Sequence, residues 1–154
     1  MLKIVITSDV HGHIERLERI THIHHDADFF LDAGDSEATE SMILPFVSVE
    51  GNNDMFHAFP KTRVIDAPPH KIYMTHSHEF FISQRDEGLV KKAKRLGCDL
   101  VIFGHSHVPL VQEMYGVTLI NPGSLYYNRD RSPISYMVLT IDDFKINIER
   151  VPYK

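Results

Sequence analysis

Short hydrophobic segments recur along the first two thirds of the chain, each separated from the next by polar residues. Five of them are brief and almost wholly apolar, and they span residues 2–7, 29–31, 46–49, 71–75 and 100–103. This pattern is typical of buried strands. Apolar residues at helical spacing predict amphipathic helices near 14–20 and 89–96, the second ended by Gly97. The order of these segments predicts β-α-β units.

The last third of the chain has a different pattern. Apolar segments flank the pairs Tyr115-Gly116 and Asp142-Asp143, at 110–114, 117–120, 135–141 and 144–151. In the final segment apolar and polar residues alternate, so we expect one buried and one exposed face. Both pairs of segments are typical of antiparallel hairpins. Together with the β-α-β units they predict a mixed α/β domain in which two packed sheets have helices on the outside.

The length and composition agree with this interpretation. The chain has 154 residues, 43% of them hydrophobic and 24% charged, which suits one folded domain over residues 1–154. No apolar run approaches the roughly 18 residues of a membrane span, and the N-terminal run is too short for a signal sequence. With a single cysteine, Cys98, no internal disulfide can form. We therefore expect a cytoplasmic protein without a membrane partner, and its formal net charge of −5 argues against binding to an extended nucleic-acid backbone.

Polar residues able to bind metal ions lie just past the predicted strands. The five strand ends lead into Ser8-Asp9-Val10-His11-Gly12, Gly34-Asp35, Gly51-Asn52-Asn53-Asp54, His76-Ser77-His78 and Gly104-His105-Ser106-His107. Each stretch by itself would also fit an ordinary turn or loop. However, open α/β sheets bind ligands at the carboxyl edge of their strands, so we expect the five stretches to converge there.

The residue types in these stretches indicate a metal centre. Histidine is the commonest side-chain ligand of transition metals, and the chain contains 11 histidines. Aspartate, histidine and asparagine without a thiolate suit Mn²⁺, Fe²⁺ or Zn²⁺ better than Cu⁺ or Ca²⁺. One metal ion would not use this many ligands, whereas two ions about 3.5–4 Å apart with a shared carboxylate would.

Taken together, the motifs resemble the signature of the calcineurin-like metallophosphoesterases. The matching stretches, in chain order, are Asp9-x-His11, Gly34-Asp35, Gly51-Asn52-Asn53-Asp54, His76 and Gly104-His105-Ser106-His107. The short chain and Asn121-Pro122-Gly123-Ser124 resemble the small bacterial and archaeal phosphodiesterase branch. The resemblance implies an α/β fold of four layers, αββα, with two mixed β-sheets flanked by helices. It also implies a dinuclear metal centre.

Carried over residue by residue, the resemblance implies two sets of ligands. The first metal ion would be bound by Asp9, His11, Asp35 and His107. The second would be bound by Asp35, Asn52, His76 and His105, with Asp35 bridging the two ions. We expect divalent ions, Mn²⁺ first, with Fe²⁺, Zn²⁺ and Ni²⁺ as alternatives. They would lower the pKa of a bridging water so that a hydroxide attacks phosphorus. Two such ions, two aspartates and one hydroxide leave about one positive charge, which suits a phosphodiester.

One position departs from the family pattern. Where this chain has Asn53, many members have a histidine that, paired with the acid after it, protonates the leaving oxygen. Asn53 cannot act as that acid, so Asp54 and His78 are the remaining candidate proton donors. The small phosphodiesterase branch commonly lacks the histidine as well. We therefore expect a preference for diesters with good leaving groups, which need little protonation.

The sequence leaves the substrate side more open. Arg129 or Arg131 could bind a substrate phosphate, or the stretch could be a solvated loop, and Tyr126 and Tyr127 could stack on a base or serve in packing. The implied protein is a metal-dependent phosphodiesterase for small phosphodiesters, and the resemblance makes a homodimer or larger assembly plausible. Two alternatives stay open. One is a metal-binding scaffold like the retromer subunit of this fold, and the other is a nuclease, which the negative charge disfavours.

Overall fold

The computed structural model describes residues 1–55, 58–143 and 145–154. Within them, one five-stranded sheet contains β1 (Leu2–Thr7), β2 (Phe29–Asp32), β3 (Phe46–Ser48), β9 (Ser135–Ile141) and β10 (Ile146–Pro152). Its strand order is β10-β9-β1-β2-β3. The strands β1, β2 and β3 run parallel, and β9 pairs antiparallel with both β1 and β10. The sheet therefore combines β-α-β units with a C-terminal hairpin.

The second sheet repeats this mixture. It contains β4 (Thr62–Ala67), β5 (His70–Thr75), β6 (Leu100–Ile102), β7 (Leu110–Met114) and β8 (Val117–Asn121). The order is β4-β5-β6-β8-β7, with β5, β6 and β8 parallel and the edge strands β4 and β7 antiparallel to their neighbours. The turn between β7 and β8 has positive φ at both Tyr115 (52°) and Gly116 (81°), which matches the twist of a two-residue hairpin.

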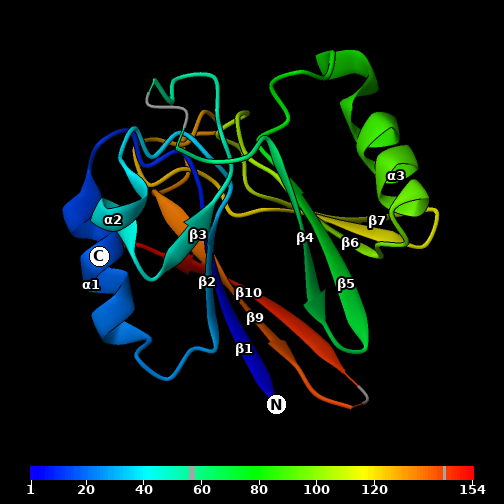
Figure 1. The fold of residues 1–154 in the computed structure, drawn as a ribbon, viewed down its shortest axis with the longest axis horizontal. Helices are drawn as coiled ribbons and strands as arrows, with labels where there is room; N and C mark the ends of the chain where they lie inside the picture. The colour runs from blue at the N-terminus through cyan, green and yellow to red at the C-terminus, as the bar shows by residue number, and fades with distance from the viewer. Residues whose placement is uncertain (56–57, 144) are drawn as a thin grey trace.

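Helices cover the outer faces of both sheets, which gives the four layers that the resemblance implied. In Figure 1, α1 (Ile14–Ile23) and α2 (Glu40–Ile43) lie on the left and α3 (Arg85–Arg95) on the right, with the sheets between them. A short 3₁₀ helix, η1 (Ile82–Gln84), precedes α3. The predicted αββα sandwich of two mixed sheets is thus confirmed. No helix in the described ranges is long and apolar enough to cross a membrane.

The alternation of side chains along the strands explains why the layers form. On β1, Ile4 and Ile6 pack between the two sheets, whereas Val5 packs on the other face with Leu17 and Ile20 of α1. All five side chains are at most 2% exposed. A strand buried on both faces must be apolar at successive positions, which is the pattern that predicted it.

Two elements differ from the sequence-based expectations. The strand β4 was not predicted, because its residues alternate between half-buried and exposed at the edge of the sheet and the apolar signal is weak. The helix α2 has only four residues, too few for helical periodicity to show. The predicted last strand starts at Ile146 in the structure, and residue 144 lies outside the described residues.

Candidate metal centre

Two overlapping groups of side chains in the described structure could hold metal ions. One contains Asp9, His11 and His107, and the other contains Asp9, Asp35 and His76; in each group the ligand atoms lie within 4.8 Å of one another. Asp9 and His11 follow β1, Asp35 follows β2, His76 follows β5 and His107 follows β6. The centre therefore lies where strands of both sheets end, as the polar stretches predicted.

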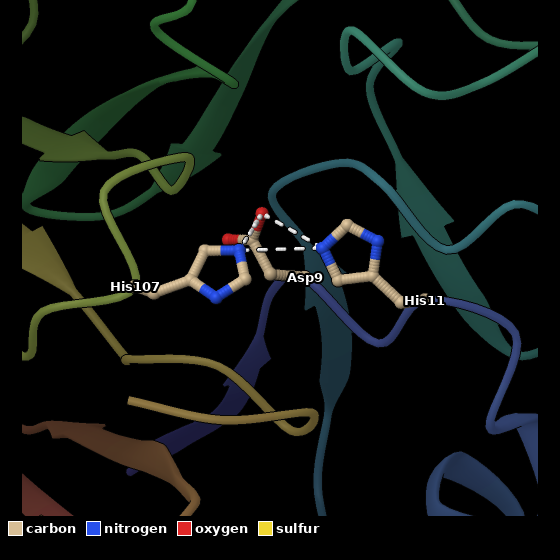
Figure 2. Close-up of side chains that lie close together, drawn as sticks. All are labelled: Asp9, His11 and His107. Carbon is tan, nitrogen blue, oxygen red and sulfur yellow. Dashed lines mark hydrogen bonds and ion pairs between the residues drawn. The ribbon is translucent and has the colours of Figure 1, made fainter. Parts of the chain in front are cut away.

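Asp9 belongs to both groups of candidate metal ligands. Its side chain is fully buried, and its Oδ2 atom accepts hydrogen bonds from the Ser8 hydroxyl (2.6 Å) and the His105 backbone N–H (3.0 Å). Its Oδ1 atom has no hydrogen-bond partner within the described part of the chain. Imidazole Nε2 atoms lie 3.3, 3.7 and 3.9 Å from Oδ1, on His107, His76 and His11. Figure 2 shows ring nitrogens of His11 and His107 directed at this carboxylate. A buried oxygen surrounded by ring nitrogens is a site that a cation completes, so these residues fit a metal ion.

The orientation of three histidines supports the same conclusion. Each donates its Nδ1–H to an oxygen that can only accept, so Nε2 faces the centre and offers a lone pair to a metal ion once any proton on it has left. The acceptors for His11, His76 and His107 are, in turn, the Glu37 carboxylate (2.9 Å), the Ala33 carbonyl (2.7 Å) and the Tyr127 carbonyl (2.9 Å). The rings are thus held in the tautomer that a metal ion requires.

The remaining predicted ligands lie on the other side of the cluster. The side-chain oxygen of Asn52 is 3.0 Å from Nε2 of His76 and 3.1 Å from Nδ1 of His105. Oδ2 of Asp35 is 3.2 Å from Nε2 of His76. The structure therefore brings all seven predicted ligands together. The residue common to the two groups is Asp9, so the bridging role of Asp35 stays a prediction.

The charges in the cluster shift the pKa values of its members. Burial on its own raises the pKa of Asp9 and of Asp35, but the interactions with neighbouring groups, foremost His107 for Asp9 and His76 for Asp35, together outweigh it, and both pKa values are lowered. Burial lowers the pKa of His76, yet Asp35 and Asp9 raise it to about 9. In the metal-free protein a proton on His76 thus balances the buried carboxylates. A metal ion binding there must displace that proton.

The backbone of the centre is strained at five of the predicted ligands. Positive φ angles occur at Asp9 (52°), His11 (47°), Asp35 (61°), His105 (72°) and His107 (58°). The left-handed region is unfavourable for residues with a Cβ atom, and it persists only where the surroundings enforce it. Such strain concentrated in one cluster is characteristic of functional sites. The sequence carries no signal for it beyond the glycines next to these positions.

Besides Gly51, which packs against the Asp35 carboxylate, two glycines are required by close packing between the two sheets at the predicted ligands. A Cβ atom on Gly104 would lie 2.8 Å from Oδ2 of Asp9 and collide with the Ser8 hydroxyl. A Cβ atom on Gly34 would lie 2.7 Å from Nδ1 of His76, and Gly34 also has φ +105°. Both glycines therefore allow strand ends from opposite sheets to approach each other.

Asp54, one of the proton donors that the sequence suggested, is bound by backbone groups of two loops. Its buried carboxylate accepts backbone N–H groups from Asp35 (2.9 Å), Glu37 (2.9 Å) and Gly51 (2.7 Å). These contacts connect the loop of Asp35 with the loop of Asn52, so we expect Asp54 to hold the Asp35 loop in position. Its role as a proton donor stays a prediction.

Asn53 and His78 lie on either side of the second group. Asn53 donates its backbone N–H (2.8 Å) and its side-chain amide (3.3 Å) to the Asp35 carboxylate, so it orients that ligand. The ring of His78 is 5.4 Å from that of His76 and 6.2 Å from that of His105. Its Nδ1 atom is buried and has no partner among the described residues. Burial, followed by the charge on His76, lowers the pKa of His78.

A cavity of about 180 Å³ opens onto the ligands. It is lined by His11, Asp35, Asn52, Asn53, His105, His107, Tyr126, Tyr127 and Arg129. Arg131 is not part of this lining in the described structure, because the chain turns at Asn128, whose carbonyl accepts the Arg131 N–H (3.2 Å). Of the two predicted phosphate-binding arginines, only Arg129 lies at the centre. A larger, more apolar cavity of about 430 Å³ lies between α1 and α2, away from the ligands.

Sequence reasoning also missed some histidine partners. His70 contacts Asp99 through Nδ1 (2.6 Å), and His24 contacts the Tyr136 hydroxyl through Nε2 (2.8 Å). Neither pair has a local sequence signal, because the partners are far apart along the chain. Both lie outside the metal-binding groups of the described structure.

The fold and the donor set together define a metal-dependent phosphoesterase. The family model of the calcineurin-like phosphoesterase superfamily domain matches residues 2–144, and the chain belongs to this family. The probable metallophosphoesterase YsnB of Bacillus subtilis is 34% identical over 145 residues, covering 92% of this chain and 86% of YsnB. Phosphodiesterase YfcE of Escherichia coli K12 is 23% identical over 171 residues, covering 92% of this chain and 89% of YfcE.

Solved structures agree with this assignment. A predicted phosphoesterase from Streptococcus pneumoniae TIGR4 superposes with a TM-score of 0.91 at 26% identity, covering 99% of this chain and 90% of its own. Vps29 of Entamoeba histolytica complexed with Zn²⁺ superposes with a TM-score of 0.73 at 22% identity, covering 99% of this chain and 100% of the Vps29 chain. At that identity Vps29 shows a shared fold only.

Proposed function

We propose that the protein is a dinuclear metal-dependent phosphodiesterase that hydrolyses small phosphodiesters. The observation that carries this proposal is the buried, unbonded Oδ1 of Asp9, with imidazole nitrogens of three histidines 3.3 to 3.9 Å away. Family membership and the similarity to a phosphodiesterase support it. Divalent ions bound here would activate a water molecule and neutralise charge on the phosphoryl oxygens.

The ligands divide into two sets in this proposal. Asp9, His11, Asp35 and His107 hold one ion; Asp35, Asn52, His76 and His105 hold the other. Asp35 bridges the two, and Mn²⁺ is the first candidate, ahead of Fe²⁺, Zn²⁺ and Ni²⁺. Glu37 and the carbonyls of Ala33 and Tyr127 keep the three anchored imidazoles in the required tautomer.

In this proposal three residues outside the ligand set, Arg129, Asn53 and His78, bind the substrate, orient a ligand or supply a proton. Arg129 lines the cavity, and its hydrogen bonds to the Tyr127 hydroxyl (3.2 Å) and the Ser106 carbonyl (3.5 Å) use two of its five N–H groups, so the rest can bind a phosphoryl oxygen. Asn53 keeps Asp35 oriented and supplies no proton. His78 is the candidate proton donor, and a diester with a good leaving group needs little help from it.

The alternative is a metal-binding scaffold of the same fold, which the fold shared with Vps29 makes possible. The complete set of seven ligands and the cavity beside them support the enzyme instead. A scaffold has no use for strained histidines and carboxylates held ready around an open cavity.

Metal-reconstituted hydrolysis tests the proposal. Metal-stripped protein is given Mn²⁺ and assayed with bis(p-nitrophenyl) phosphate and p-nitrophenyl phosphate in parallel. We expect hydrolysis that requires the metal and is faster with the diester. The variant Asp35→Asn should lose this metal-dependent hydrolysis. The control variant His25→Ala, at an exposed position after α1, should retain it. Faster monoester hydrolysis would overturn the diester assignment, and metal binding without turnover of either compound would favour the scaffold.

A further inference from the structure

Two exposed tyrosines form one wall of the cavity. Tyr126 and Tyr127 are 49% and 45% exposed, although each ring contacts metal-binding histidines. The Tyr126 ring lies edge-on to His11, with centroids 5.5 Å apart, and the Tyr127 ring lies 5.0 Å from His107. The side of these rings that does not contact the protein is therefore open to the cavity, next to the first group of ligands.

The loop that carries the tyrosines is held rigidly by buried hydrogen bonds. The Ser124 hydroxyl donates to the Asp9 carbonyl (2.8 Å) and accepts the N–H groups of Tyr126 (2.8 Å) and Tyr127 (3.2 Å). The buried Asn128 side chain accepts the Ser124 N–H (2.7 Å) and donates to the Pro133 carbonyl (2.8 Å). The rings are thus fixed relative to Asp9, which reduces the entropy lost when a ligand binds to them.

Neighbouring side chains also fix the rings themselves. Tyr126 stacks on His13, with centroids 5.6 Å apart and an angle of 17° between the planes. The Arg129 Nε–H donates to the Tyr127 hydroxyl, and the guanidinium lies 5.9 Å from the Tyr127 ring centre. The two tyrosine rings are perpendicular neighbours, with centroids 5.4 Å apart and 74° between their planes. Together with Arg129 they place a cation and aromatic surface side by side on the cavity wall. Such a surface suits a ligand with an anionic group joined to a flat ring.

We infer that Tyr126 and Tyr127 form a subsite for an aromatic ester group of the substrate, such as an aryl ring or a nucleobase. This inference rests on the proposed function, since it names the substrate class of the same site. The tyrosines lie beside His11 and His107, whereas Asn53 and His78 lie by the second group of ligands. A diester has one ester group that leaves and one that stays on phosphorus. Because the candidate proton donor His78 lies by the second group of ligands, the leaving group points toward Asn53 and His78, and the aromatic group at the tyrosines is the one that stays on phosphorus.

A pair of diesters with one leaving group tests the subsite. The Mn²⁺-loaded protein is assayed with phenyl p-nitrophenyl phosphate and methyl p-nitrophenyl phosphate, and kcat/KM is measured for p-nitrophenolate release. We expect wild type to prefer the phenyl diester. Tyr126→Leu and Tyr127→Leu should each reduce that preference, measured as the ratio of the two kcat/KM values, by about 2- to 10-fold, the range for one aromatic contact. Any effect of the substitution on the metal ligands or on Arg129 changes both rates and cancels in this ratio. Tyr126→Phe should keep the preference because it keeps the ring.

The matched control is Tyr115→Leu, an exposed tyrosine (74%) on the β7–β8 turn, which should change neither rate. An unchanged preference in both cavity variants would overturn the subsite. A change of oligomeric state in Tyr126→Leu without a change of preference would do so too, and would assign the tyrosines to a contact between copies of the chain.

A binding measurement separates failure of the subsite from failure of the proposed function. Phenylphosphonate and methylphosphonate, which are not diesters and are not hydrolysed, are titrated into the Mn²⁺-loaded protein by calorimetry. We expect tighter binding of phenylphosphonate, reduced in Tyr126→Leu and Tyr127→Leu by the same 2- to 10-fold or so. If no diester is hydrolysed, the proposed function fails, and the ratio of the phenylphosphonate affinity to the methylphosphonate affinity then tests the subsite by itself. Equal binding of the two phosphonates would overturn it.

Discussion

Replacement of Asp54 by asparagine tests whether the metal centre depends on one buried carboxylate that lies outside the predicted ligand set. The two oxygens accept three backbone N–H groups: Oδ2 those of Asp35 (2.9 Å) and Gly51 (2.7 Å), and Oδ1 that of Glu37 (2.9 Å). Asparagine has one acceptor oxygen. If it keeps the two bonds of Oδ2, its NH₂ group faces the Glu37 N–H, and two donors oppose each other.

The magnitude follows from these contacts. One hydrogen bond to a charged acceptor, worth about 1.5–3 kcal/mol, is lost, and the other two weaken as the charge disappears. We expect Asp54→Asn to lower the free energy of unfolding by about 3 kcal/mol, or the melting temperature by roughly 6–12 °C. Metal affinity should fall as well, because the Asp35 and Asn52 loops lose their connection.

Urea unfolding of the metal-free protein and metal titration measure these effects. The control is Asp66→Asn, an exposed aspartate on β4, which should change stability by less than about 0.5 kcal/mol. Activity is compared on bis(p-nitrophenyl) phosphate and on diphenyl phosphate, whose leaving group is poorer. A positioning residue lowers both rates by a similar factor. A proton donor would lower the second rate far more.

Two results would refute this reasoning. Wild-type stability and metal affinity in Asp54→Asn would show that the three N–H groups do not need the charge. A rate loss confined to diphenyl phosphate would identify Asp54 as the acid that the sequence suggested.

Three further predictions concern other parts of the centre. Asp35→Asn should reduce bound metal below two ions per chain and lower kcat/KM at least ~1,000-fold, measured by metal analysis and diester hydrolysis; two ions with normal turnover would contradict the bridging role. Gly104→Ala should cost about 1–3 kcal/mol in urea unfolding, because its methyl group would lie 2.8 Å from Oδ2 of Asp9. Burial raises the pKa of Asp32 from 3.8 to about 8, so the folded metal-free protein holds that proton more tightly than the unfolded chain. The protonated Asp32 side chain therefore contributes fully to the free energy of unfolding below pH 3.8, and this contribution is lost as the pH rises through about 8. When unfolding is measured in a chelator at several pH values, the free energy of unfolding should depend less on pH in Asp32→Asn than in wild type.

Much of the fold could be predicted from local pattern. The bounds of β1, the start of α1, and both C-terminal hairpins agree with the apolar periodicity, because strands buried on both faces and amphipathic helices each leave a distinct repeat. The edge strand β4 and the single turn α2 were missed, because their stability comes from pairing and packing with distant residues. The stretches that contain the seven candidate ligands were found because each follows a strand, and the resemblance to the family selected the seven residues within them.

The sequence by itself determined which side chains could bind metal ions and at which edge of the sheets they would gather. Only the tertiary structure decided how each is used. The His76 imidazole is oriented by the Ala33 carbonyl and that of His107 by the Tyr127 carbonyl, so backbone atoms of distant residues select the tautomer. The three backbone N–H groups that bind the Asp54 carboxylate likewise come from loops that only the fold brings together. Hydrogen bonds depend on distance and angle between atoms that the fold brings together, and residue type does not record those quantities.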